Sequence, residues 1–223
     1  KRGIKLAAVW LESTPDVVRT ADSYADVVDL NIFVDSETIY QRHTKRPEKC
    51  LGTYHPQDSF YFKPGGGGAI SVSFIGTLVS RPLRCAFIGS LLANGVPVTK
   101  LGGHKEWMVS SETMAKVLGM SRIVLNFGDA GSFKHYKVRV AEATLSGALL
   151  MDWENEETLK IFEPYREFVP FSTPEDLLRK AQYYLTHDKE RREMAERGRQ
   201  KALERLDGRE FWRKVFDRLE VPK

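Results

Sequence analysis

Two charged residues three positions apart, Arg139 and Glu142, have types and spacing that suit the binding of a phosphorylated ligand. An apolar stripe at intervals of three and four accompanies them, at Val138, Ala141, Leu145 and Ala148. This period predicts a helix over residues 134–146, ended by Gly147. The start of a helix favours anions, because its unpaired N–H groups and its dipole are electropositive. A carboxylate one turn further in can hold ribose hydroxyls, so the segment predicts a nucleotide-sugar site.

The same pair also has a plainer interpretation. Arg139 and Glu142 could form an ordinary ion pair on a helix surface, which contributes only about 0.2–0.5 kcal/mol. The local pattern leaves both interpretations open.

Composition indicates a globular chain that can bury a core. Of the 223 residues, 42% are hydrophobic and 29% are charged, as in folded domains. No apolar run approaches the ~18–20 residues that cross a bilayer, and no signal peptide opens the sequence. Because a strand-like pattern follows Lys1 at once, we expect a fragment or a trimmed chain. Cys50 and Cys85 lack metal-ligand spacing, so we expect no metal site, no disulfide and a cytoplasmic location.

The chain is basic, with a formal net charge of +4. Nucleic acid, a membrane surface and phosphorylated substrates all fit a basic protein. Much of the positive charge lies between Lys189 and Lys214, interspersed with glutamates, which is typical of a solvated helix face. Aromatic residues that could stack on bases are not interleaved there. We therefore expect no nucleic-acid partner, whereas peripheral membrane contact stays open.

The first part of the chain contains two strand-like runs, at residues 4–10 and 27–34, with helical character between them. A further helix is expected over residues 36–42, with Asp35 as its N-cap, and then a loop over residues 53–58. The glycine run at residues 65–68 predicts a hinge or linker. A phosphate cradle is the less favoured interpretation, because a cradle follows a strand and these glycines precede one.

Strands and helices alternate after the glycine run, which predicts an α/β fold with a parallel sheet covered on both faces. Ligands of such sheets bind beyond the carboxyl ends of the strands. The expected strands cover residues 70–75, 96–101, 123–127, 148–152 and 167–171. The expected helices cover residues 82–94, 111–118, 134–146 and 156–162, and a further helix begins after Thr173-Pro174.

From residue 71 to about residue 205, the order of these pieces resembles the donor-binding domain of GT-B glycosyltransferases, closest to the spore-maturation-protein (CgeB-like) group. The segments that carry the resemblance are Val72–Gly76, Ile123–Phe127, Arg139–Gly147 and Phe171–Leu185. The resemblance implies a GT-B type fold: a Rossmann-like parallel-sheet donor domain plus part of a second Rossmann-like domain. The implied divisions are 1–63 (acceptor side), 64–69 (linker), 70–206 (donor domain) and 207–223 (a helix that crosses back).

The resemblance also implies roles for single residues. Glu142 would bind the ribose of a nucleotide diphosphate sugar, and Arg81 and Arg139 would neutralise the diphosphate. Main-chain groups of residues 126–131 would line the base and phosphate pocket. The full set of expected donor-binding residues is Gly76, Arg81, Asn126, Phe127, Lys137, Arg139, Glu142 and Asp152. Asp152 could equally cap the segment that follows it.

One position departs from the pattern of retaining GT-B enzymes, which place a carboxylate eight residues before the ribose-binding one. That position is Lys134, so Lys134 either contacts a phosphate, or the sugar is held differently, or the sugar site has decayed. If the reaction inverts, the base would come from the acceptor side, with His55 as the candidate. A retaining mechanism needs no enzymic base.

Together these features predict a hexosyltransferase-like enzyme that moves a sugar from a nucleotide diphosphate sugar to an unknown glycan, protein or small-molecule acceptor. We expect a metal-independent and retaining reaction, with no cofactor besides the donor. The alternative is a non-catalytic nucleotide-sugar-binding or scaffolding protein of the same fold, which the lysine at position 134 favours and the Arg139/Glu142 pair opposes.

Overall fold

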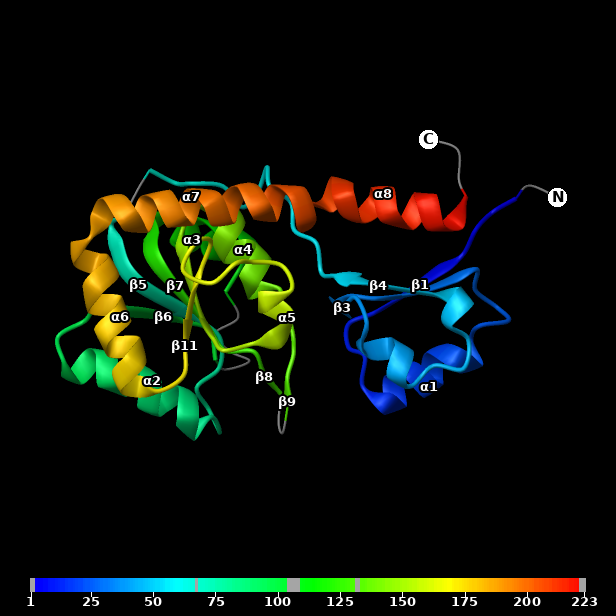
Figure 1. Cartoon of the computed structure of the whole chain (residues 1–223), viewed down its shortest axis with the longest axis horizontal. Coiled ribbons are helices and arrows are strands. Elements are labelled where there is room, and N and C mark those ends of the chain that lie inside the picture. Colours follow the sequence, from blue (N-terminus) through cyan, green and yellow to red (C-terminus); the bar gives the residue numbers. More distant parts are fainter. Residues whose placement is uncertain (1–2, 67, 104–108, 131–132, 221–223) are drawn as a thin grey trace. The chain divides into compact units, whose positions relative to one another are not determined.

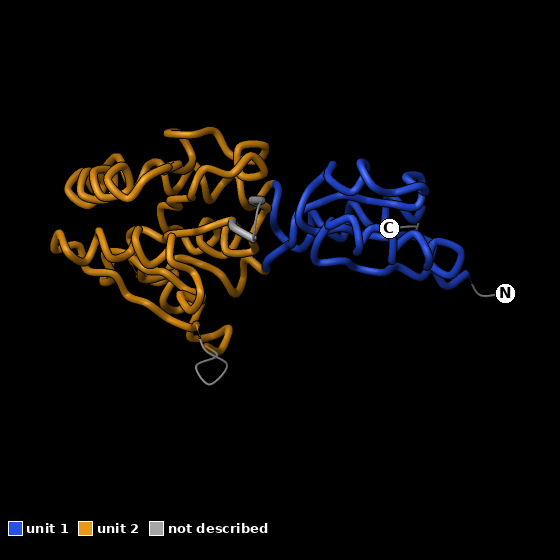
Figure 2. The backbone as a smooth tube through the Cα atoms, turned by 90° about the horizontal axis from the view of Figure 1, so that it is seen from below, with its two compact units in different colours: residues 1–57, 205–223 blue, residues 58–204 orange. Residues whose placement is uncertain are grey.

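The structure is a computed structural model that describes residues 3–66, 68–103, 109–130 and 133–220. The chain divides into two compact units, coloured separately in Figure 2. Unit 1 consists of Lys1–Gln57 and Arg205–Lys223, and unit 2 consists of Asp58–Glu204. Each unit has its own parallel sheet.

Unit 2 is built on five parallel strands in the order β11-β10-β7-β5-β6 (Figure 1). The strands are β5 (Ile70–Ile75), β6 (Val98–Leu101), β7 (Ser121–Asn126), β10 (Leu149–Trp153) and β11 (Val169–Phe171). The expected parallel sheet is therefore present, and β5 has its expected bounds. A short antiparallel hairpin, β8 (Asp129–Ala130) and β9 (Phe133–Lys134), follows β7.

Helices cover both faces of this sheet (Figure 1). They are α2 (Pro82–Ala93), α3 (Ser111–Met120), α4 (Arg139–Leu145), α5 (Glu156–Leu159), α6 (Pro174–Thr186) and α7 (Asp188–Arg205). Helices α2 and α6 pack together on one face, whereas α3 and α4 contact the strands from the other. Thr173 caps α6 as expected, since its side chain accepts a hydrogen bond from the N–H of Asp176.

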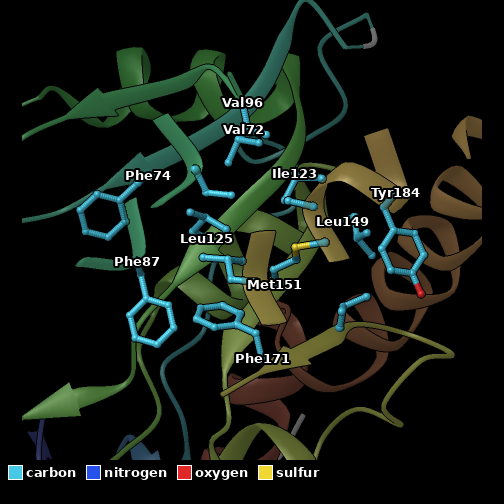
Figure 3. Packing of buried hydrophobic residues seen from close by; sticks show 14 of the residues in the cluster. Val72, Phe74, Phe87, Val96, Ile123, Leu125, Leu149, Met151, Phe171 and Tyr184 are labelled. Carbon is cyan, nitrogen blue, oxygen red and sulfur yellow. The ribbon is translucent and has the colours of Figure 1, made fainter. Parts of the chain in front are cut away.

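The core of unit 2 lies between the sheet and helices α2 and α6, and Figure 3 shows how its side chains interlock. Every second residue of the central strands points into it, such as Ile123 and Leu125 of β7. Phe87, Phe127 and Phe171 meet with ring centroids 5.3–5.5 Å apart. Burial on both faces explains why these strands read as nearly continuous apolar runs.

Helix α7 lies very close to the segment before β11. Gly198 makes this possible, because a Cβ at that position would lie 2.4 Å from the carbonyl oxygen of Glu167. One residue earlier, Arg197 Nε donates to the carbonyl of Arg166 at 2.8 Å. This close backbone contact fixes the helix in addition to its core side chains, Met194 and Ala195.

Unit 1 has a four-stranded sheet in the order β1-β2-β4-β3, in which only β3 runs antiparallel. Its elements are β1 (Ala7–Trp10), α1 (Pro15–Ser23), β2 (Leu30–Phe33), β3 (Asp35–Ser36), β4 (Cys50–Tyr54) and α8 (Gly208–Leu219), with 3-10 turns at Ile39–Arg42 and Pro47–Lys49. The last helix packs on this sheet, where Phe211, Val215 and Leu219 meet Leu30 and Ile32.

Three local expectations in unit 1 need correction. Asp35 is not an N-cap: its carboxylate accepts from the backbone N–H and the hydroxyl of Ser13. The expected helix over 36–42 is a short strand followed by a 3-10 turn, with the hydroxyl of Ser36 accepting from the N–H groups of Thr38 and Ile39. The expected loop over 53–58 begins later, because β4 continues to Tyr54.

Two helices of unit 2 also differ from expectation. Helix α4 begins only at Arg139, since β8 and β9 form a hairpin and the residues between β9 and Arg139 are not part of a helix. Helix α3 runs through Gly119 to Met120 instead of ending before it. The expected stop at Gly147 is confirmed by its φ of 76°. Among the described residues, no helix has the length and apolar character that a membrane span requires.

Candidate functional site

The candidate site lies along the edge of the unit 2 sheet where the five parallel strands have their carboxyl ends. Gly76 follows β5, Gly102 follows β6, Phe127 follows β7, Glu154 follows β10 and Ser172 follows β11. In open parallel sheets, this edge is where ligands bind.

The loops after β5 and β6 lie against each other at this edge. The N–H of Gly76 donates to the carbonyl of Leu101 at 2.9 Å, and the hydroxyl of Thr77 donates to the carbonyl of Gly103 at 3.2 Å. A Cβ at Gly76 would lie 3.0 Å from the ring of Phe74. Gly76 therefore allows tight packing where the first strand ends.

Helix α4 carries the expected charged pair. The guanidinium of Arg139 donates to the carboxylate of Glu142, and only 15% and 4% of the two side chains are exposed. The flanking residues Val140, Ala141 and Ala143 are fully buried, so the helix is enclosed on nearly every side. The pair is not an ordinary surface pair.

Burial gives Arg139 an unusual environment. It lowers the pKa of the guanidinium, and the carboxylate of Glu142 opposes that shift. Arg139 Nη1 also lies 2.8 Å from Met114 Sδ of α3. The buried Nε–H finds no acceptor among the residues that the structure describes. A buried donor without an acceptor is costly, so this position suits a ligand oxygen.

Lys137 and His135 come together just before α4. The side-chain nitrogen of Lys137 is within hydrogen-bond distance of His135 Nε2. Sequence reasoning selected Lys137 and missed His135, which is 5% exposed. The missed signal was the alternation of basic residues at positions 135, 137 and 139, which an extended chain would place on one side.

Asp152 and Asn126 also meet, in a different manner. Asn126 Nδ2 donates to Asp152 Oδ1 at 2.8 Å, and the hydroxyl of Thr158 donates to Asp152 Oδ2 at 2.5 Å. Asp152 has no exposed surface. Asn155, rather than Asp152, caps α5 by accepting from the N–H of Glu157 at 3.1 Å. Asp152 thus ties two strands to α5, and a role in donor binding stays a prediction.

Two arginines of α2 lie near the end of β5. Arg81 occupies the N-cap position and is partly exposed. Arg84, which sequence reasoning did not select, is buried, donates to the carbonyl of Thr77 at 3.2 Å and lies 5.9 Å from the centroid of the Phe127 ring. Phe127 itself is part of the aromatic core. Hence Arg84 is a second cation at this edge, one helical turn beyond Arg81.

Lys134 and His55, the two expected catalytic residues, belong to different units. The backbone of Lys134 belongs to β9, but its side chain lies outside the described part of the structure. His55 follows β4 in unit 1, where its Nδ1 lies 3.0 Å from the carbonyl of Pro56. Gly131, the last of the positions expected to line the base and phosphate pocket, also falls outside the described residues. Within the described ranges, no three His, Cys, Asp or Glu side chains cluster as a metal site requires.

Several solved structures share this fold at low sequence identity. Anabaena HepE, in a crystal structure with UDP-glucose, superposes with a TM-score of 0.75 and 13% identity, over 98% of this chain and 72% of HepE. TarM gives a TM-score of 0.70 and 10% identity, over 99% of this chain and 51% of TarM. The C-terminal domain of the group 1 glycosyl transferase LpcC from Francisella tularensis gives 0.57 and 11%, over 68% of this chain and 99% of that domain.

These similarities establish the fold, a GT-B type α/β architecture with a Rossmann-like parallel sheet. No curated protein matches the sequence. A family model described as glycosyl transferase-like matches residues 78–217, from the loop before α2 almost to the end of α8. Because this match covers well over half of the chain, the protein belongs to the glycosyl transferase-like family.

Proposed function

We propose that this protein transfers a sugar from a nucleoside diphosphate sugar, of the UDP-sugar class, to an acceptor. The buried Arg139–Glu142 pair beside the carboxyl edge of the sheet carries the proposal, in a chain of glycosyl transferase-like family. The HepE structures with UDP-glucose and with UDP and glucose support the choice of donor. The four segments that resemble the CgeB-like group support membership of that group.

In this proposal Glu142 accepts hydrogen bonds from the ribose hydroxyls, and Arg139 and Lys137 hold the diphosphate. When the bond between the sugar carbon and the β-phosphate oxygen breaks, negative charge grows on that phosphate. Fixed cations stabilise this charge without having to reorganise. Glu142 already pairs with Arg139. When the donor binds, the ribose hydroxyls would replace some contacts of Glu142, and the diphosphate would replace some contacts of Arg139.

We further propose that the reaction retains the configuration of the sugar and proceeds without a metal ion. Arg139, Lys137, Arg81 and Arg84 would supply the positive charge that a metal supplies elsewhere. Retention needs no enzymic base, whereas inversion would require one such as His55. Both cysteines are free thiols, which supports a cytoplasmic location.

Isothermal titration calorimetry tests the proposal. UDP, GDP, ADP and TDP are titrated into the wild-type chain, in EDTA and then with magnesium. We expect UDP to bind selectively and equally well under both conditions, whereas selective binding of another diphosphate would contradict the UDP-sugar class of donor. Selective binding only with magnesium would contradict the metal-independent mechanism, and no binding of any diphosphate by a folded sample would contradict the proposed donor.

Glu142→Gln is the matching variant. It removes the charge but keeps the shape, and we expect the bound diphosphate to lose roughly 10- to 100-fold in affinity, as hydrogen bonds to a charged group are worth about 1.5–3 kcal/mol. Glu163→Gln is the control, because Glu163 pairs with Arg166 at the same spacing but with both side chains about 60% exposed. An unchanged affinity in Glu142→Gln would remove Glu142 from the site. A wild-type protein that binds the nucleotide sugar but transfers no sugar would favour the scaffolding alternative.

A further inference from the structure

The stretch between β9 and α4 carries two basic side chains two positions apart, His135 and Lys137. The contact between Lys137 Nζ and His135 Nε2 shows that the two lie on the same side of this stretch. Arg139 follows at the start of α4, where it pairs with Glu142.

His135 is the fixed member of this contact. Its backbone N–H donates to the carbonyl of Gly128 at 2.9 Å, and its carbonyl accepts from Asn155 Nδ2 at 2.9 Å. Asn155 is itself held by α5, whose first turn it caps. The ring is buried, so both its backbone and its surroundings define where Nε2 lies.

Lys137 is the adaptable member. A lysine ammonium ends a stem of four carbons with many rotamers, and it can only donate hydrogen bonds. The contact with His135 therefore requires an unprotonated Nε2, with the proton of the neutral ring on Nδ1. The main chain of Lys137 is fixed as well, because its carbonyl accepts from the N–H of Val140 in the first turn of α4 at 2.9 Å.

We propose that His135 is a positioning residue, which holds the Lys137 ammonium at the entrance of α4 so that it meets the diphosphate of the donor. This inference rests on the proposed function. His135 acts through Lys137 and does not touch the donor, so its loss weakens ligands that carry phosphates and spares the nucleoside alone.

The test compares UDP with uridine by calorimetry in the wild type and in His135→Leu, His135→Asn, His135→Gln and Lys137→Met. His135→Leu and His135→Asn leave no acceptor at the place of Nε2, and we expect each to lose about tenfold in UDP affinity with uridine affinity unchanged. Glutamine puts its amide oxygen near that place and should keep UDP affinity within about threefold. Thermal unfolding of each variant establishes that it is folded.

A double-mutant cycle gives the second readout, since residues that act through one contact are not additive. Adding His135→Asn to Lys137→Met should cost no further UDP affinity. Additive losses, or equal losses for UDP and uridine, would show that His135 only supports the fold and would overturn the inference. If the wild type binds uridine and UDP equally, or binds no diphosphate at all, the proposed function itself fails, which is a distinct result.

Discussion

The two sheets of the molecule differ in how completely they are covered. In unit 2, the residues of β7 and β10 are almost all buried, because α2 and α6 cover one face and α3 and α4 the other. In unit 1 the central strand β2 is buried as well, but it packs against two smaller clusters, and the edge strand β1 leaves more than half of the Val9 side chain exposed. The candidate donor site is therefore built on the part of the chain with the deeper core.

This difference shows what holds a binding site in place. Arg139, Glu142 and His135 belong to short segments that have little stability of their own, since α4 has only seven residues. The covered sheet beneath them determines their positions. In unit 1, the residues near His55 rest on a smaller core, where six buried side chains join α8 to β2 and its continuation at Val34.

Truncating one apolar side chain in each sheet should show the difference in core size most clearly. Phe171 is fully buried against Phe87 and Phe127, so Phe171→Ala should lower the free energy of unfolding by about 3–5 kcal/mol. Val9→Ala should change it by less than about 0.5 kcal/mol, as expected of an exposed position. Urea unfolding followed by circular dichroism measures both. Similar losses for the two variants would mean that the sheets are equally covered in solution.

Two buried aspartates provide a second test of the difference between the units. Asp152 in unit 2 accepts from Asn126 and Thr158 and is fully buried, whereas Asp35 in unit 1 accepts from Ser13 and is 5% exposed. Asp152→Ala should cost about 2–4 kcal/mol, because it strands two buried donors. Asp35→Ala also strands two donors, but both belong to Ser13 in the loop before α1, which can shift to meet water, so we expect a smaller cost of about 1–2 kcal/mol. The reverse order in urea unfolding would contradict the assignment of the deeper core to unit 2.

The smallest effect concerns pH. Burial raises the pKa of Asp176 in α6, but hydrogen bonds from Lys180 and Arg179 outweigh it, so the net pKa is lowered. Arg213 lowers the pKa of Glu210 in α8 through a hydrogen bond. A carboxyl whose pKa is lower in the folded state stabilises the fold at neutral pH, and this contribution disappears as pH falls through the folded pKa.

Asp176→Asn and Glu210→Gln should therefore each reduce stability at pH 7 by less than about 1 kcal/mol, as both pairs are near the surface. The deficit should shrink as the pH falls below about 4, the ordinary range of these carboxyls. Thermal unfolding across pH 2–7 measures it. A deficit that stays constant over this range would show that the charges are not its source.

Much of unit 2 could be predicted from the sequence, because burial on two faces gives a strong pattern. Strand β5 and the cap at Thr173 follow directly from apolar runs and cap residues. The start of α4 could not be predicted, since an apolar stripe at helical spacing does not reveal that the preceding residues pair as a hairpin. Asp35 was misassigned for a similar reason: its partner Ser13 is 22 residues away, beyond any local pattern.

Within the candidate site, the sequence predicts some of the residues that take part but not how deeply they are buried. The spacing of Arg139 and Glu142 predicts that they meet, and they do. It does not distinguish a buried pair from an exposed one, because the covering elements come from distant parts of the chain. Arg84 was missed because its burial, rather than its type or spacing, sets it apart, whereas His135 had a signal in its alternation with Lys137 and Arg139.

The backbone contact at Gly198 has a consequence for how this sequence can evolve. Every single-nucleotide change that replaces this glycine adds at least a Cβ, which would collide with the carbonyl of Glu167. A descendant can change that position only after α7 or the segment before β11 has shifted. Diverging descendants of this sequence would then keep a glycine here longer than they keep the surface residues around it.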